Sequence, residues 1–159
     1  ALHENKIEIN MKPAKDIARG VNLLDVITIV PSKKSYVLKL SKTGKYAVFE
    51  TKDNEEKPIK IMNKTLLKGK KMQLNLIDGR NILTDQKCKT HDSVLFNFKN
   101  KKITKILEMK KGANVMVYAG KHSGEEGVIE EINEEKKTAT IKTKESKIDA
   151  LIKQIIVLK

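Results

Sequence analysis

The feature that most constrains the fold of this chain is a long succession of short strand signals separated by turn residues. Val115 and Val117 alternate with Met116 and Tyr118, as in a strand with one buried face, and residues 36–40 and 45–50 flank a turn that contains Gly44. The dipeptide Asp78-Gly79 lies between two further runs and is a two-residue hairpin signal. So many short strands with close turns favour small β barrels over a parallel α/β sheet. We therefore predict a mainly β protein.

The remaining strands are expected on the same grounds at residues 6–9, 25–30, 72–77, 80–83, 94–98, 103–108, 128–132, 138–143, 146–150 and 154–158. Residues 59–67 stay open between helix and strand, because their apolar positions fit both periods. Residues 52–57 are expected to form a charged loop. The aromatic side chains are expected to pack in the core, with Tyr118 as a candidate exception; they are Tyr36, Tyr46, Phe49, Phe96, Phe98 and Tyr118.

Residues 115–129 combine a strand, a glycine-rich turn with a basic pair, and a returning strand. The glycines of the turn and its basic pair are Gly120, Gly124, Gly127, Lys121 and His122. Glycine accepts positive φ and has no side chain in the way, so such a turn can bring backbone N–H groups close to a phosphate. From the residues alone, however, the simplest interpretation is a hairpin turn whose glycines satisfy backbone geometry.

The chain of 159 residues carries a net charge of +13, and the excess lies in its middle. Residues 31–120 contain 21 basic and 8 acidic side chains, whereas residues 1–30 and 121–159 are each balanced. Such a field favours a polyanionic partner and speeds encounter with it. Only Arg19 and Arg80 are arginines, and lysine is a point charge without a fork for reading bases. We therefore expect contact with the backbone and shape of a nucleic acid.

Basic residues at the expected turns are the candidate contacts. Any one of these lysines is most simply a solvated surface residue, but solubility alone does not require so large a collective excess. Besides the glycine turn, the candidates for phosphate contact are Lys33, Lys34, Lys68, Lys70, Lys71, Arg80, Lys99, Lys101, Lys102, Lys110 and Lys111.

Other functional classes find little support in the sequence. No apolar run approaches the roughly 20 residues that cross a bilayer, and the charged residues 1–10 lack the apolar core of a signal peptide. The single cysteine, Cys88, excludes an internal disulfide framework and fits a reducing compartment. The histidines and Cys88 do not fall at zinc-ligand spacings, and Asp25 and Asp78 are expected to serve turn hydrogen bonds. We expect no catalytic residue, metal, cofactor or small-molecule substrate.

Residues 115–143 resemble a KOW motif, the hairpin of small SH3-like barrels in ribosomal proteins and transcription elongation factors. Four further patterns occur in order before the hairpin: GVNLLDVI at 20–27, GKYAV at 44–48, LIDGRNI at 76–82 and GANVMV at 112–117. Over nearly the whole chain this series resembles the archaeal and eukaryotic small-subunit ribosomal protein S-four-e family.

The resemblance implies tandem small β domains. Residues 1–30 would be the C-terminal part of an S-four-type RNA-binding domain, residues 31–110 a central β-barrel-like domain, and residues 111–159 an SH3-like KOW barrel. It also implies a non-enzymatic, structural constituent of the small ribosomal subunit in the cytoplasm, with ribosomal RNA and neighbouring ribosomal proteins as partners and no membrane. For the glycine turn, the resemblance implies nucleic-acid contact, with Lys121 on a phosphate and His122 stacking or hydrogen-bonding. Met11 and Ala119 stand where the family often has glycine.

Two alternatives stay open at this point. The balanced charge of residues 121–159 and the carboxylates of Glu125 and Glu126 favour a KOW-containing transcription or translation factor that grips a protein partner. Residues 20–117 count against it, because such factors do not share these patterns. A nucleic-acid-modifying enzyme would need a cleft lined by acidic residues or a metal.

Overall fold

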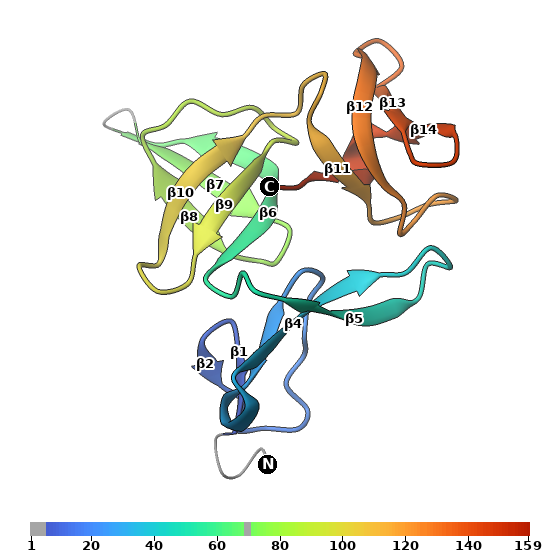
Figure 1. Ribbon diagram of the computed structural model, residues 1–159. Coiled ribbons are helices and arrows are strands. Elements are labelled where there is room, and N and C mark those ends of the chain that lie inside the picture. The colour runs from blue at the N-terminus through green and yellow to red at the C-terminus, as the bar shows by residue number, and fades with distance from the viewer. Residues whose placement is uncertain (1–5, 69–70) are drawn as a thin grey trace.

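The computed structural model describes residues 6–68 and 71–159, and within these ranges the strands form three consecutive five-stranded antiparallel sheets (Figure 1). The mainly β prediction is therefore confirmed. The second and third sheets each enclose a core of their own, whereas the first sheet contributes Leu24 to a core shared with the third. Among the described residues, no helix has the length and apolar character that crossing a membrane requires.

The first sheet has the strand order β2-β1-β3-β4-β5. Its strands are β1 (Ile7–Ile9), β2 (Lys12–Pro13), β3 (Val26–Ile29), β4 (Lys34–Leu40) and β5 (Tyr46–Thr51). A short 3-10 helix, η1 (Val30–Ser32), links β3 to β4 and contains Pro31, which has no N–H for a ladder bond. The β1–β2 turn places Asn10 and Met11 at positive φ, 51° and 60°, so Met11 has the backbone conformation that a glycine would adopt most easily.

The second sheet has the order β10-β9-β6-β7-β8. Its strands are β6 (Glu56–Leu66), β7 (Met72–Leu76), β8 (Asn81–Thr84), β9 (Ser93–Asn97) and β10 (Lys102–Leu107). The open choice at residues 59–67 is settled as strand, because Ile59 and Ile61 both enter a core closed by Leu74, Val94 and other residues of the neighbouring strands. The hairpin expected at residues 78–79 connects β7 to β8.

The third sheet has the order β14-β13-β12-β11-β15. Its strands are β11 (Asn114–Val117), β12 (Glu126–Asn133), β13 (Thr138–Lys142), β14 (Lys147–Leu151) and β15 (Ile155–Val157), with the 3-10 helix η3 (Ile152–Gln154) before β15. Val115, Val117, Ile129, Ile141 and Ile155 are buried against one another in its core. These are the inward positions of the alternating pattern read from the sequence.

The sheets and the expected domains divide the chain differently at one point. β3 pairs with β4 from Val26 opposite Val37 to Ile29 opposite Lys34, so the first sheet continues across residue 30. The second sheet begins at Glu56 and the third at Asn114. The division into domains 1–30, 31–110 and 111–159 stays a prediction.

The three sheets meet at a shared junction (Figure 1). Leu24 from the first sheet's loop packs there with Met116 of β11 and Ile156 of β15, and all three side chains are buried. The C-terminus lies beside β6, where the Lys159 ammonium contacts the carboxylates of Asp53 and Glu56 at 2.8 and 3.0 Å. The sheets therefore hold one another in place through both apolar and charged contacts.

Two local expectations prove wrong. Phe96 and Phe98 are buried, with ring centroids 5.9 Å apart, but Tyr46 is 70% exposed and Phe49 45% exposed. Both exposed rings lie on β5, an edge strand paired only with β4, so that neighbouring strands cover less of it. The charged loop expected at residues 52–57 ends early, because Lys57 belongs to β6 and is buried.

Candidate nucleic-acid interface

The glycine loop, residues 120–124, packs against the β4–β5 hairpin of the first sheet. Gly124 is buried at φ +93°, and a Cβ at this position would lie 1.9 Å from the Ser41 carbonyl oxygen. A Cβ on Gly44, in the same hairpin, would lie 2.9 Å from the Ser123 Oγ atom. Close approach of two chain segments therefore accounts for glycine on both sides of this contact.

The other two glycines also meet neighbouring parts of the protein. A Cβ on Gly120 would lie 2.8 Å from the Gln154 Oε1 atom, and one on Gly127 would lie 2.4 Å from the Lys142 carbonyl oxygen. Inside the loop, the amides of Ser123 and Gly124 donate to carbonyl oxygens of Gly120 and Val117, at 3.2 and 2.8 Å. These two amides are thus used within the fold rather than presented to a phosphate.

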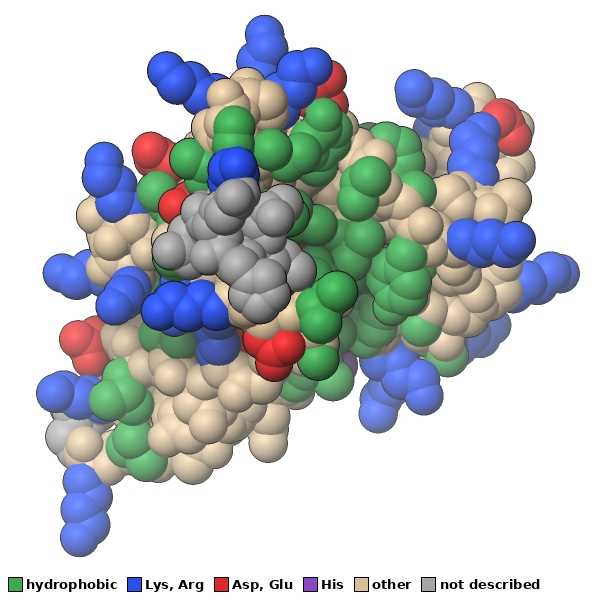
Figure 2. Space-filling view, turned by 90° about the horizontal axis from the view of Figure 1, so that it is seen from below, with side chains coloured by type: hydrophobic (Ala, Val, Ile, Leu, Met, Phe, Trp, Pro, Cys, Tyr) green, Lys and Arg blue, Asp and Glu red, His purple; other side chains and the backbone are tan. Residues whose placement is uncertain are grey.

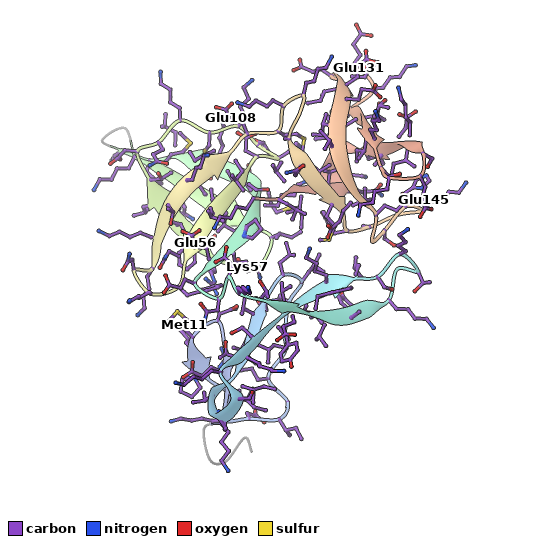
Figure 3. All side chains as sticks on the ribbon, viewed as in Figure 1. Met11, Glu56, Lys57, Glu108, Glu131 and Glu145 are labelled. Atoms are coloured by element: carbon purple, nitrogen blue, oxygen red, sulfur yellow. The ribbon has the colours of Figure 1, made fainter. Side chains whose placement is uncertain are left out.

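The carboxylates beside the loop have partners within the chain. Glu126 accepts a hydrogen bond from the Lys39 ammonium of β4 at 2.8 Å. Glu125 lies 3.6 Å from the Nδ1 atom of His122. Figure 3 shows Glu145 between the third sheet and the β4–β5 hairpin, where it forms an ion pair with Lys42. Glu126 and Glu145 thus help to dock the third sheet on the first, whereas Glu125 lies beside His122 of its own loop.

Most of the candidate lysines are exposed, but they are spread over the molecule. Because β6 and β9 are antiparallel, with Glu56 opposite Asn97, the β6–β7 and β9–β10 turns lie at opposite ends of the second sheet. Lys33 follows η1, and Lys34 is the first residue of β4 in the first sheet. The exposed candidates are Lys33, Lys34, Lys68, Lys71, Lys99, Lys101, Lys102, Lys110, Lys111 and Lys121, whereas Lys70 lies outside the described residues.

Figure 2 shows one face of the molecule, seen from below the view of Figure 1. Lysine and arginine side chains project along much of its outline, and hydrophobic side chains gather across its middle. The basic side chains visible in this view therefore surround an apolar area instead of forming a single basic surface.

Arg80 is held inside its own sheet. Its Nε atom lies 3.2 Å from the Asp78 carboxylate, and its guanidinium lies over the rings of Phe96 and Phe98, at 4.9 and 5.6 Å from the ring centroids. The Asp78 carboxylate also accepts from the Arg80 amide at 3.2 Å, as expected for a turn aspartate. Arg80 thus has a structural role in the β7–β8 hairpin.

Lys57, which sequence reasoning missed, is buried where the second sheet meets the first (Figure 3). Its ammonium lies 2.6 Å from the Asp25 carboxylate, and both side chains are almost fully buried. Asp25 also accepts from the Asn10 side chain at 2.8 Å and from the Asn22 amide at 2.7 Å. From the sequence, Asp25 could be recognised as a turn aspartate. The residues around Lys57 do not indicate that its ammonium contacts Asp25, which is 32 residues away in the chain.

Lys60 makes the corresponding contact between the second and third sheets. Its side chain is fully buried, and its ammonium donates to the carbonyl oxygens of Ile152 and Ile155 at 2.7 and 2.5 Å. The ammonium also lies 5.7 Å from the ring centroid of Tyr118. Burial lowers the pKa of Lys60 from 10.5 to about 8. Lys57 and Lys60 both count toward the net charge of +13 but cannot meet a partner at the surface.

Cys88 is buried in the core of the second sheet. The Cys88 Sγ atom contacts the Met72 sulfur at 3.9 Å, and burial raises the pKa of its thiol. In the described part of the chain, no group of three or more His, Cys, Asp or Glu side chains could hold a metal ion.

Comparisons with known proteins give matches over most of the chain. The model of the ribosomal family S4e matches residues 32–103, and the KOW motif matches residues 111–142. The small ribosomal subunit protein eS4 of Archaeoglobus fulgidus is 44% identical over 115 residues, which cover 72% of this chain and 49% of the relative. The chain thus spans about half the length of that relative.

Two further matches extend over nearly the whole chain. The small ribosomal subunit protein eS4 of Methanosphaera stadtmanae is 32% identical, with 99% of this chain and 68% of the relative covered. The crystal structure of the 30S ribosomal protein S4e from Thermoplasma acidophilum has the same fold, with a TM-score of 0.84, 22% identity, and coverage of 99% of this chain and 82% of that one. The chain therefore belongs to the ribosomal protein family S4e, and its C-terminal part carries a KOW motif.

Proposed function

We propose that this chain is a structural constituent of the cytoplasmic small ribosomal subunit and binds ribosomal RNA through exposed lysines. The names of its relatives support the ribosomal assignment. The observation that carries the RNA-binding part is the excess of positive charge in residues 31–120, most of whose candidate lysines are exposed. Neighbouring proteins of the subunit are its other partners, and no reaction takes place.

The positions of the lysines favour several separate contacts over one continuous surface. Basic turns at opposite ends of the second sheet can each neutralise phosphates on a different part of a folded RNA. Lysine suits this role, because a point charge on a flexible stem needs no fixed base geometry. Arg80 and His122 contribute less, since both have partners within the chain.

The glycine loop has a more limited part in this proposal than its sequence indicates. Lys121 is exposed and can contact phosphate, whereas Gly124 is buried against the first sheet. The loop therefore orients the KOW barrel, and Lys121 supplies the charge.

Sedimentation tests the ribosomal assignment. The tagged chain should migrate with small subunits through a sucrose gradient and stay with them in a high-salt wash, because a constituent is held by many contacts. Replacing Lys99, Lys101 and Lys102 with alanine should lower retention in high salt. Replacing Lys136 and Lys137, in the β12–β13 turn of the charge-balanced region, is the matched control and should lower retention less. A chain that washes off completely would contradict the proposal.

Such a wash-off would favour the alternative, a KOW-containing factor that grips a protein. One observation that favoured this alternative is weakened. Glu125 and Glu126 have basic partners inside the chain and are not solely available to a protein partner.

A further inference from the structure

A groove of about 630 Å³ lies where the three sheets meet. Its lining comes from the inner face of β4, the segment leading into β6, the start of β12, the end of β13 and the C-terminus. Its apolar side chains include Leu24, Val26, Val37, Pro58, Leu95 and Leu158, and the other lining residues are mostly polar or charged. The groove thus lies between the three sheets, and its lining combines apolar with charged side chains.

Exposed apolar side chains extend the groove at its edge. Val128 lines it and is 40% exposed. Phe49 is 45% exposed and lies directly opposite Val37 on the neighbouring strand, so it shares the face of the sheet that forms the groove wall. The apolar surface therefore continues beyond the cavity, which suits an elongated ligand better than a compact one.

On one side of the groove, positive charge exceeds negative charge once the ion pairs of the lining are taken into account. The Lys39 ammonium is paired with Glu126, and the Lys159 ammonium is paired with Asp53 and Glu56. The other two cations of the lining are Lys142, at the end of β13, and Lys144, in the turn that follows, and both are exposed. An occupant that complements this groove is apolar along its length and carries a carboxylate where it passes these two lysines.

We propose that the groove binds an extended, acidic segment of another protein of the small subunit. This inference rests on the proposed function, which places the chain on that subunit. A nucleic-acid strand fits less well, because its sugars and phosphates would meet the apolar part of the floor, where they find no hydrogen-bond partners. An extended peptide can bury apolar side chains in the floor and direct its carboxylates to Lys142 and Lys144.

Site-specific photocross-linking in assembled small subunits tests this assignment. A benzophenone amino acid at Val128 reports on the groove, and the same amino acid at Leu151 is the matched control. Leu151 is 37% exposed, close to the 40% of Val128, and belongs to β14 at the far edge of the third sheet. The Val128 position should yield one discrete adduct with a protein, identified by mass spectrometry, that the Leu151 position does not yield.

Charge reversal then tests the two lysines. The double variant Lys142→Glu and Lys144→Glu should lower the yield of the Val128 adduct about fivefold or more. The variant Lys136→Glu and Lys137→Glu, at the opposite end of β13, should leave it unchanged. Thermal unfolding checks that each variant folds, and Lys142→Gln with Lys144→Gln replaces the reversal if it does not.

The outcomes separate this inference from the proposed function. A chain that sediments with small subunits but cross-links at Val128 only to RNA, only to itself, or equally after charge reversal overturns the groove assignment alone. A chain that never sediments with small subunits overturns the proposed function, and the groove assignment with it.

Discussion

Replacing Lys60 with methionine tests the contact that joins the second and third sheets. The ammonium is fully buried and donates to the carbonyl oxygens of Ile152 and Ile155. Burial lowers its pKa from 10.5 to about 8, which corresponds to about 3 kcal/mol against the charged form, at about 1.4 kcal/mol per pKa unit. Methionine keeps most of the side-chain length and removes both the charge and the two hydrogen bonds.

The direction in which the free energy of unfolding changes with pH follows from the protonation of Lys60 in the folded and the unfolded chain. Below about pH 8 both the folded and the unfolded chain carry a protonated Lys60, so the full burial penalty lowers the stability of the fold. Between about pH 8 and 10.5 the unfolded chain keeps the proton and the folded chain has lost it, so the free energy of unfolding rises with pH. Wild type should therefore gain about 3 kcal/mol over the Lys60→Met variant across this window.

The lost hydrogen bonds act in the opposite direction at every pH. Each carbonyl left without a donor costs about 1–3 kcal/mol. At neutral pH the variant loses the two hydrogen bonds but no longer buries a charge, and these two effects on its free energy of unfolding should nearly cancel. At high pH only the loss of the hydrogen bonds remains, so the variant should be less stable than wild type. Burial raises the pKa of the neighbouring Tyr118 phenol and is the main cause that lowers the pKa of His91. The Lys60 charge also contributes to the lowered pKa of His91, but that pKa lies below 6.5, so the His91 titration falls outside the window above about pH 8.

Urea unfolding followed by circular dichroism, at several values between about pH 7 and 10.5, measures this difference. The control is Lys105→Met, which removes an exposed lysine of β10 and should differ from wild type by a constant amount. A Lys60→Met difference that is also constant with pH would refute the reasoning, because Lys60 would then not be buried at the junction of the sheets.

Three further substitutions test other parts of the fold by the same unfolding assay. Gly124→Ala should destabilise the protein by more than about 2 kcal/mol, because the clash of its Cβ with the Ser41 carbonyl oxygen adds to the cost of positive φ. The control is Gly79→Ala, at φ +83° with open space around it, which should cost only about 1 kcal/mol. Asp25→Ala should cost about 3–5 kcal/mol by leaving the buried Lys57 ammonium unpaired, and adding Lys57→Met should recover part of that loss; an unchanged stability would show the pair to be solvated. Met11→Gly should stabilise by about 1 kcal/mol, since φ is 60° at that position, and a loss of stability would argue against this turn.

The sequence predicted the parts of the structure that depend on local patterns. Alternation and the Asp78-Gly79 turn were enough to predict the β7–β8 hairpin, and the glycine-spaced run at 115–129 predicted β11 and β12. These features depend on residues within a few positions of each other. By pattern alone, residues 59–67 fit both a helix and a strand, because only the neighbouring strands β7 and β9 distinguish the two.

The features that the sequence did not predict depend on contacts between distant segments. Lys57 and Lys60 look like surface lysines until Asp25 and the carbonyls of η3 and β15 lie against them. The sequence indicated glycine at 124 for turn geometry, but Ser41 is far away in the chain and sets the closest approach. Among the described residues, ten of the candidate lysines are exposed, but their scatter over opposite ends of a sheet follows only from the strand register.

The salt dependence of binding to isolated small-subunit ribosomal RNA tests the central claim most directly. If exposed lysines engage Z phosphates, the logarithm of the affinity should fall linearly with the logarithm of the salt concentration, at a slope of about −0.7Z to −0.9Z. If Lys99, Lys101 and Lys102 each engage one phosphate, replacing all three should reduce the magnitude of this slope by about 2 to 3. An affinity that stays the same from low to physiological salt would contradict the account.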